Sequence, residues 1–197
     1  MPWLEPVTLR GEHARLEPLS HDQIDALTEA AKDGELWKLW YTAIPKPENM
    51  KKEIDRRLGL QAAGSMLPFT VFDAAGKISG MTTFMNVDTP NRRVEIGSTW
   101  YAKRVQRSAV NTQCKLLLLT HAFEKLDCIA VEFRTHFFNH QSRRAIERLG
   151  AKQDGILRSH QISPNGSLRD TVVFSIIAGE WPTVKAHLNY QLNEKAR

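Results

Sequence analysis

The sequence predicts a mixed α/β (α+β) fold, and three features carry that prediction. Residues 67–101 alternate between strand-like apolar runs and turns, which is the pattern of an antiparallel meander. Residues 92–135 show the order strand, loop, helix and strand, so the second strand is expected to lie parallel to the first. Amphipathic helical patterns at 20–34 and 48–63 precede these strands.

The length of the chain favours one domain that spans residues 1–197. It has 197 residues, of which 42% are hydrophobic and 25% charged, enough for one substantial core and few for two. No apolar run approaches the ~20 residues that cross a bilayer, and the first residues lack the basic head and apolar stretch of a secretion signal. We therefore expect a cytoplasmic protein with no membrane partner.

The first third of the chain predicts a short β segment and two helices. Residues 7–19 hold two short alternating runs, typical of a first strand or a small hairpin. Ser20 and Gln23 have the spacing of a capping box, for a helix that ends near Gly34. A second helix is expected over residues 48–63 and is rich in Lys and Arg.

The remaining elements follow from apolar periodicity and turn residues. Within the meander, strands are expected over 67–73 and 77–88 and from Arg92 onward. After the central helix we expect a strand over 129–135, a helix capped by Asn139 and closed by Gly150, strands over 155–162 and 168–177, and a terminal helix over 180–192.

The stretch from Arg92 to Leu126 predicts a phosphate site. A strand leads into a turn with Lys103, Arg104 and Arg107, and a helix follows. The first turn of a helix has backbone N–H groups without partners and a partial positive charge, so a phosphate can bind there. Arginine side chains at the same point add formal charge.

The net charge of +5 and the pI near 9.3 indicate an anionic partner. The cations gather around one loop, and no Lys/Arg tract with interleaved aromatics is present. A compact phosphate-bearing ligand is thus favoured, with a basic nucleic-acid-binding domain as the weaker alternative. Neither Cys114 and Cys128 nor the seven histidines have metal-ligand spacing, so no metal is expected.

Three segments carry a resemblance to a known family. They are LRGEHARLEPL near the N-terminus, EIGSTWYAKRVQRSAVNTQCKLLLLTHAFEKL in the middle, and IAVEFRT followed by the helix NHQSRRAIERLGA. Together they resemble the GNAT superfamily of acyl-CoA-dependent N-acyltransferases, in the branch typified by the RimJ and RimL ribosomal-protein N-terminal acetyltransferases. The resemblance implies a mostly antiparallel seven-stranded sheet with a parallel pair splayed for CoA, four to five flanking helices, and a homodimer.

The resemblance also implies the reaction. An acetyl group would pass from acetyl-CoA to a primary amine, on a protein N-terminus or a small molecule, by direct transfer in a ternary complex without a metal. The positions that match the family's cofactor-binding elements are Trp100, Arg104, Val105, Gln106, Arg107, Ser108, Ala109, Val110, Asn111, Asn139, Ser142 and Arg143. Arg107 stands where the family has glycine, so it is expected to cost the loop conformational freedom and to offer a charge-assisted contact instead.

Glu95 is the expected catalytic base, because it lies on the strand beside the implied cleft and could take the amine proton. A surface carboxylate paired with Arg92 or Arg93 is its structural alternative, and His136 is a competing base. Gly97 on the same strand indicates a close approach, a bulge or plain packing.

Ser142 is the expected acid, since the helix after the fifth strand lacks the tyrosine that many GNAT enzymes have there. Ser142 is equally readable as a helix-capping residue.

Two questions stay open at this level. Trp37, Trp40 and Tyr41 indicate either core packing or, with Met85, the wall of an acceptor pocket. The missing loop glycine and helix tyrosine also leave room for a CoA-binding or sensing module that has lost catalysis.

Overall fold

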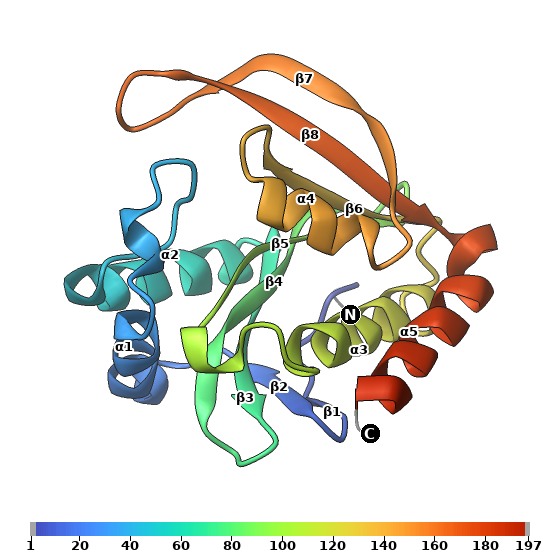
Figure 1. The fold of residues 1–197 in the computed structure, drawn as a ribbon, viewed down its shortest axis with the longest axis horizontal. Coiled ribbons are helices and arrows are strands. Elements are labelled where there is room, and N and C mark those ends of the chain that lie inside the picture. The colour runs from blue at the N-terminus through green and yellow to red at the C-terminus, as the bar shows by residue number, and fades with distance from the viewer. Residues whose placement is uncertain (1–2, 196–197) are drawn as a thin grey trace.

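The computed structural model describes residues 3–195 (Figure 1). Over these residues the chain forms one eight-stranded sheet in the order β1-β2-β3-β4-β5-β6-β8-β7, flanked by five α-helices. The strands are β1 (Leu9–Arg10), β2 (Ala14–Pro18), β3 (Met66–Asp73), β4 (Ile78–Asp88), β5 (Arg93–Tyr101), β6 (Ala130–His136), β7 (Lys152–Ile162) and β8 (Leu168–Ile177). The helices are α1 (Ile24–Lys32), α2 (Met50–Ala62), α3 (Val110–Glu124), α4 (His140–Glu147) and α5 (Trp181–Lys195).

The mixed α/β fold and the parallel pair are confirmed, while the strand number is corrected from seven to eight. All neighbouring strands are antiparallel except β5 and β6. The extra strand comes from residues 7–19, which form a hairpin rather than one strand, with Leu9 opposite Leu16.

The helix starts follow the local signals in the sequence. The Ser20 backbone N–H donates to Gln23 Oε1 at 3.1 Å, as a capping box requires, although one 3₁₀ turn precedes α1. A 3₁₀ turn at Pro47–Asn49 likewise precedes α2. At α4, Asn139 Oδ1 accepts the Ser142 backbone N–H at 3.0 Å, so the predicted cap is confirmed.

The helices cover the sheet from two sides. In Figure 1, α1 and α2 lie to one side of β4 and β5, and α3 and α5 lie to the other. β3 and β4 are buried along most of their length, and α3 joins α5 through Phe123 stacked on Trp181 with ring centroids 5.3 Å apart.

Both cysteines are free thiols inside the structure. Cys114 on α3 and Cys128 before β6 are buried. Burial raises the pKa of each thiol to about 12.

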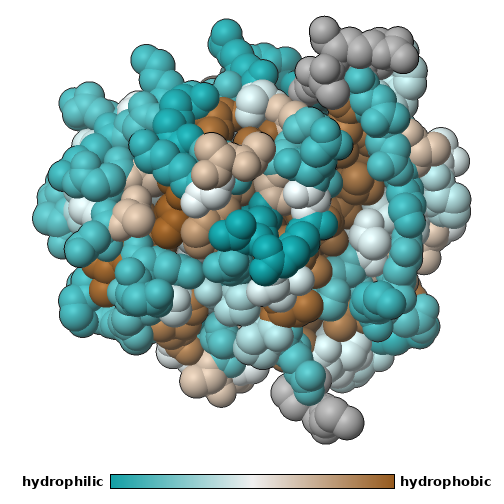
Figure 2. Space-filling view, turned by 90° about the horizontal axis from the view of Figure 1, so that it is seen from below, coloured by the Kyte–Doolittle hydropathy of each residue, from teal (hydrophilic) through white to brown (hydrophobic). Residues whose placement is uncertain are grey.

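The outer surface is mostly hydrophilic where Figure 2 shows it. Hydrophobic residues appear there between polar ones, on the side of β1, β2 and α5. Among residues 3–195, no helix combines the length and the apolar character needed to cross a membrane.

The parallel pair opens halfway along its length. β5 and β6 are in register only at Arg93 with Ala130, Val94 with Val131 and Glu95 with Glu132. Beyond these pairs the two strands separate, while β4 continues beside β5 and β8 beside β6. The predicted splay is confirmed, and it leaves two strand edges facing a gap.

Candidate active site

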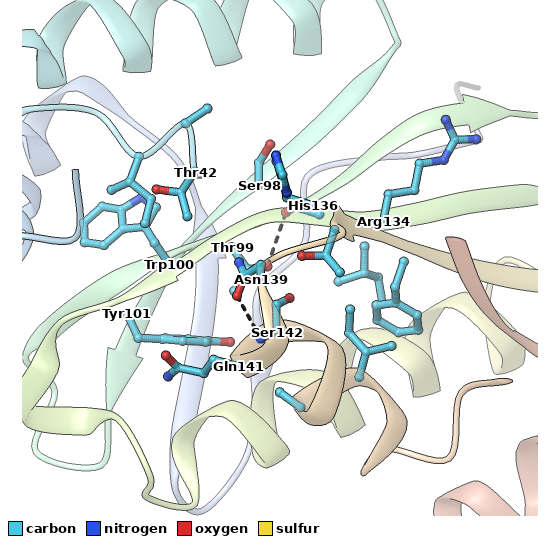
Figure 3. Close-up of a pocket in the computed structure, with 18 of the residues that line it drawn as sticks. Thr42, Ser98, Thr99, Trp100, Tyr101, Arg134, His136, Asn139, Gln141 and Ser142 are labelled. Carbon is cyan, nitrogen blue, oxygen red and sulfur yellow. Dashed lines mark hydrogen bonds between the residues drawn. The ribbon is translucent and has the colours of Figure 1, made fainter. Parts of the chain in front are cut away.

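A cavity with a volume of about 930 Å³ occupies the gap between β5 and β6. Its wall includes the β5–α3 loop, the start of α4, the segment between α1 and α2, and the tips of β7 and β8. Figure 3 shows how side chains from β5, β6 and α4 converge on it. Of the predicted site residues, Glu95, Trp100, Val105, Gln106, Arg107, Ser108, Asn111, Asn139 and Ser142 line this cavity.

Glu95 is a buried carboxylate at the point where the strands separate. It is 5% exposed, and its Oε2 accepts from Asn86 Nδ2 at 2.7 Å and lies 3.6 Å from Arg134 Nε. Burial raises the pKa of Glu95 above its usual value, against the opposing effects of Asn86 and Arg134. The alternative of a surface carboxylate is wrong, because Arg92 pairs with Asp127 and Arg93 with Glu132.

Gly97 makes room for the second oxygen of Glu95. A Cβ at Gly97 would stand 2.7 Å from Glu95 Oε1 and 2.7 Å from Met85 Sδ. A larger residue would therefore require the end of the Glu95 or Met85 side chain to shift, and the register slip beside Gly97 also fits the bulge interpretation.

Two bulges shape the strands around Glu95. Ser98 has a φ of 47° and, with Thr99, lies where the β4–β5 register slips between Thr83–Gly97 and Met81–Trp100. Asn86 has a φ of 48° at a second slip, and its side chain reaches Glu95. Asparagine tolerates this left-handed conformation better than most residues.

A buried arginine from α2 holds the first bulge. Arg57 is 2% exposed; its Nη2 donates to the Ser98 carbonyl at 3.2 Å and its Nη1 to Thr83 Oγ1 at 2.8 Å. Glu53 neutralises it, with Nε to Oε1 at 2.7 Å. The sequence showed only a Lys- and Arg-rich helix, so this role was missed.

His136 lies at the end of β6, enclosed by aromatic rings. It is 3% exposed, and its ring centroid lies 5.0 Å from that of Trp40 and 6.3 Å from that of Tyr41. Burial, followed by the charge of Arg169, lowers its pKa. Nδ1 accepts the Phe138 backbone N–H at 3.1 Å, so the lone pair of the neutral ring is already used, which disfavours the role of base.

Only some of the aromatic residues between α1 and α2 line the cavity. Tyr41 and Met85 line the cavity. Trp40 packs on the outside of His136 and is 51% exposed, and Trp37 lies outside the lining.

The central residues of the β5–α3 loop line the cavity. Val105, Gln106, Arg107 and Ser108 line it, followed by Asn111 in the first turn of α3. Arg107 has a φ of 60°, the left-handed conformation that glycine adopts without strain. The expected conformational cost at this position is therefore present.

Four predicted cofactor-binding residues lie outside the cavity. Arg104 instead pairs with Asp73 and donates to the Ile78 carbonyl at 2.9 Å, which ties the loop to the β3–β4 hairpin. Arg143 lies over the Phe137 ring, with its guanidinium carbon 5.0 Å from the centroid. Ala109 and Val110 line a separate small cavity of about 240 Å³.

Helix α4 brings Asn139 and Ser142 to the cavity opposite β5 (Figure 3). The Asn139 cap uses the Ser142 backbone N–H and leaves the Ser142 hydroxyl free to face the cavity. Tyr101 Oη, also in the lining, is buried without a partner among the described residues, and burial raises the pKa of this phenol well above its usual value.

Lys115 is a site residue that sequence reasoning missed. It lines the cavity and is 6% exposed, and its Nζ donates to Thr99 Oγ1 at 3.2 Å. Burial lowers its pKa to about 8. The helical spacing from Asn111 to Lys115 puts both residues on one face. That spacing was the signal in the sequence from which Lys115 could have been predicted as a site residue.

The described part of the chain holds no group of three or more His, Cys, Asp or Glu side chains that could bind a metal ion.

Comparison with known proteins gives the family. Residues 13–152 match the family model described as "Acetyltransferase (GNAT) domain". YdaF of Bacillus subtilis (strain 168), named as a candidate ribosomal N-acetyltransferase, is 34% identical over 106 residues, which cover 54% of this chain and 57% of that relative.

The fold has close structural relatives. A GCN5-related N-acetyltransferase from Brucella melitensis superposes with a TM-score of 0.86 at 30% identity, covering 97% of this chain and 87% of that one. A candidate acetyltransferase from T. thermophilus gives a TM-score of 0.84 at 32% identity, covering 96% and 99%. RimJ of Mycobacterium smegmatis, solved with CoA-disulfide, shares the fold with a TM-score of 0.78 at 19% identity, covering 94% and 93%. The chain belongs to the GNAT family of N-acetyltransferases.

Proposed function

We propose that this protein moves an acetyl group from acetyl-CoA to a primary amine by direct transfer in a ternary complex. The observation that carries the proposal is the buried carboxylate of Glu95, which meets the cavity where the parallel strands separate. A base there can receive a proton from an amine, and the gap beside it can receive a thioester.

The cavity suits the acyl donor. The open edges of β5 and β6 offer backbone groups to the amides of a pantetheine arm, and the loop before α3 offers N–H groups to a pyrophosphate. Lys115 adds a buried amine whose only described partner is one hydroxyl. These features fit acetyl-CoA, which when bound would supply the activated acyl group.

The residues divide the proton transfers between them. Glu95 accepts a proton from the attacking amine, as the N–C bond forms and the C–S bond breaks. The Ser142 hydroxyl relays a proton from solvent to the departing sulfur, so the serine is a neutral hydroxyl again at the end of the step. A backbone N–H of the bulge at Ser98 and Thr99, positioned through Arg57, polarises the carbonyl.

For the acceptor we propose a protein N-terminus, with a small-molecule amine as the alternative. YdaF is named for ribosomal N-acetylation. An acetyl transferase from Salmonella typhimurium, described as modifying the N-terminal serine of the 50S ribosomal subunit protein L7/L12, has the same fold at 17% identity and a TM-score of 0.77, covering 87% of this chain and 99% of that one. A cytoplasmic, single-domain homodimer completes the proposal.

Initial rates of thiol release from acetyl-CoA, measured against a panel of peptides and amines, test the proposal. Intersecting double-reciprocal lines would agree with a ternary complex, and parallel lines would exclude it. Thermal unfolding with CoA is the companion measurement, since a ligand at ~100 times its Kd stabilises by about 2.7 kcal/mol. Stabilisation without turnover of any amine would favour the CoA-binding module over the enzyme.

A further inference from the structure

We propose that the Nε2–H group of His136 is a fixed hydrogen-bond donor that binds an oxygen of the acceptor, next to the amine that is acetylated. This inference rests on the proposed function and names a chemical requirement for its substrate: a carbonyl, carboxylate or hydroxyl oxygen beside the primary amine.

The hydrogen bonds of the ring set its tautomer. Nδ1 accepts the Phe138 backbone N–H at 3.1 Å, so the neutral imidazole must carry its proton on Nε2. Burial and Arg169 lower the pKa of His136, which keeps the ring neutral at pH 7. The side chain therefore offers one donor and no free lone pair.

That donor has no partner within the described residues. Nε2 is buried and unpaired, and His136 lines the cavity. Opposite His136 on β8 stands Thr171, whose hydroxyl is engaged by Arg169 Nε at 3.0 Å and His160 Nδ1 at 3.1 Å. A buried N–H without a partner destabilises the protein, and a ligand oxygen would remove that cost.

The ring is held in place for this task. Trp40 meets it edge to face at 5.0 Å, and Phe138 lies at 5.8 Å. Because both χ angles are restrained by these contacts, the N–H direction is preset and little entropy is lost when it binds.

The donor lies on the same side of the sheet as the base. Side chains alternate along a strand, so Glu132, Arg134 and His136 share one face of β6, and Arg134 contacts Glu95 on that face. Tyr41 and Trp40 come from the α1–α2 connection, not from the loop or helix at the proposed pyrophosphate site. In the view of Figure 3, His136 lies at the end of the cavity away from Tyr101 and Gln141. Glu95 is in register with Glu132, four residues before His136 on the same strand, so an amine whose neighbouring oxygen binds His136 would pass its proton to Glu95 through water.

The test compares two amines of similar shape, alaninamide and sec-butylamine, of which only the first has an oxygen beside the amine. We expect His136→Phe to lower the ratio of kcat/KM for alaninamide to kcat/KM for sec-butylamine by about 3- to 30-fold. His136→Gln, whose amide can place a donor near Nε2, should recover most of the ratio. Comparing this ratio between the variant and the wild type cancels the different basicities of the two amines, and His187→Phe on α5 is the matched control.

Two results would overturn the inference. An equal fall in kcat with both amines would mean that the Nε2–H group binds the thioester carbonyl, or that the ring has only a structural role. A ¹⁵N NMR spectrum that shows the proton on Nδ1 at pH 7 would remove the donor itself. The NMR arm, repeated with added alaninamide, also separates the two proposals: an Nε2–H resonance that shifts on binding, without any turnover, supports the acceptor site while the acetyltransferase reaction fails.

Discussion

The two halves of the cavity are built by different means. The half that we propose for the acyl donor, called the donor half, is formed by the loop 103–108 and the start of α3, which are one continuous stretch of the chain. The half that we propose for the acceptor, called the acceptor half, gathers the side chains of Asn86, Glu95, Arg134 and His136 from three strands. Substitutions in the acceptor half should therefore change turnover, and those in the donor half should change stability or cofactor affinity.

The largest expected effect is in the acceptor half. Glu95→Gln should lower kcat by about 10²- to 10⁴-fold, because it removes the base while keeping the shape and the Asn86 contact. Glu29→Gln is the matched control: it neutralises an exposed carboxylate on α1 that pairs with Lys32 and lies outside the cavity lining. A loss below 10-fold in steady-state kcat for Glu95→Gln would exclude Glu95 as the base.

The raised pKa of Glu95 also predicts how kcat/KM depends on pH. It predicts in addition that Glu95→Gln loses activity without losing stability. Because its pKa is raised in the folded state, kcat/KM should fall as pH decreases through that raised value, and the Gln variant should lose this limb. A carboxyl with a raised folded pKa contributes stability that is lost as pH rises, so near pH 7 the charged group costs stability. Chemical denaturation should thus find Glu95→Gln at least as stable as the wild type.

Gly97→Ala should be the next largest effect, at about 10- to 100-fold in kcat, because a displacement of the base by less than 1 Å is costly. The added methyl would meet Glu95 Oε1 at 2.7 Å. Gly155→Ala on β7, where a Cβ meets nothing within 4 Å, is the matched control. Circular dichroism of both variants tests whether the fold is kept, and full activity of Gly97→Ala would contradict the packing.

Lys115 tests the comparison between the two halves, because it is a buried side chain of the donor half that should affect both stability and acetyl-CoA binding. Its folded pKa of about 8 lies below the usual 10.5, so the protein loses stability as pH falls through this range. Lys115→Met should raise the free energy of unfolding at pH 7 by a few kcal/mol, and this gain should shrink toward pH 10.5. It should also raise the KM for acetyl-CoA. Urea titrations at both pH values are the measurement, and an equal gain at both would show that charge burial is not the cause.

The smallest expected effects are changes in stability, and they should differ between the two arginines of the loop. Arg104→Gln should lower Tm by about 2–6 °C, since its guanidinium ties the loop to Asp73 and Ile78. Arg107→Gly relieves the left-handed strain but adds freedom to the unfolded chain, so stability should change by less than ~1 kcal/mol. Differential scanning fluorimetry compares them, and a larger loss for Arg107→Gly would reverse the assignment.

The sequence predicted those features that are encoded by one continuous stretch of residues. The meander, the strand–helix–strand unit and the Asn139 cap are local patterns, and the structure has all three. The extra strand arose because Leu9–Arg10 is two residues long, too short for alternation to separate a strand from a turn.

Of the four side chains of the acceptor half, the sequence indicated Glu95 and, in another role, His136. The partners of Glu95, Asn86 and Arg134, meet it through a bulge and a cross-strand contact that no spacing in the sequence encodes. Arg104 shows a different limit: its position matches the family motif, and the sequence did not reveal that its side chain forms an ion pair with the neighbouring hairpin. A motif fixes the path of the backbone more firmly than the direction of a long side chain.

The burial of both cysteines has a practical consequence for assay chemistry. A disulfide reagent that detects released CoA reacts with thiolates, and Cys114 and Cys128, buried with pKa values of about 12, form almost none at pH 8. The folded enzyme should thus add no background colour to the progress curve. The same reagent, applied without acetyl-CoA during heating or in urea, should register two thiols per chain as they become exposed and so count unfolded molecules directly.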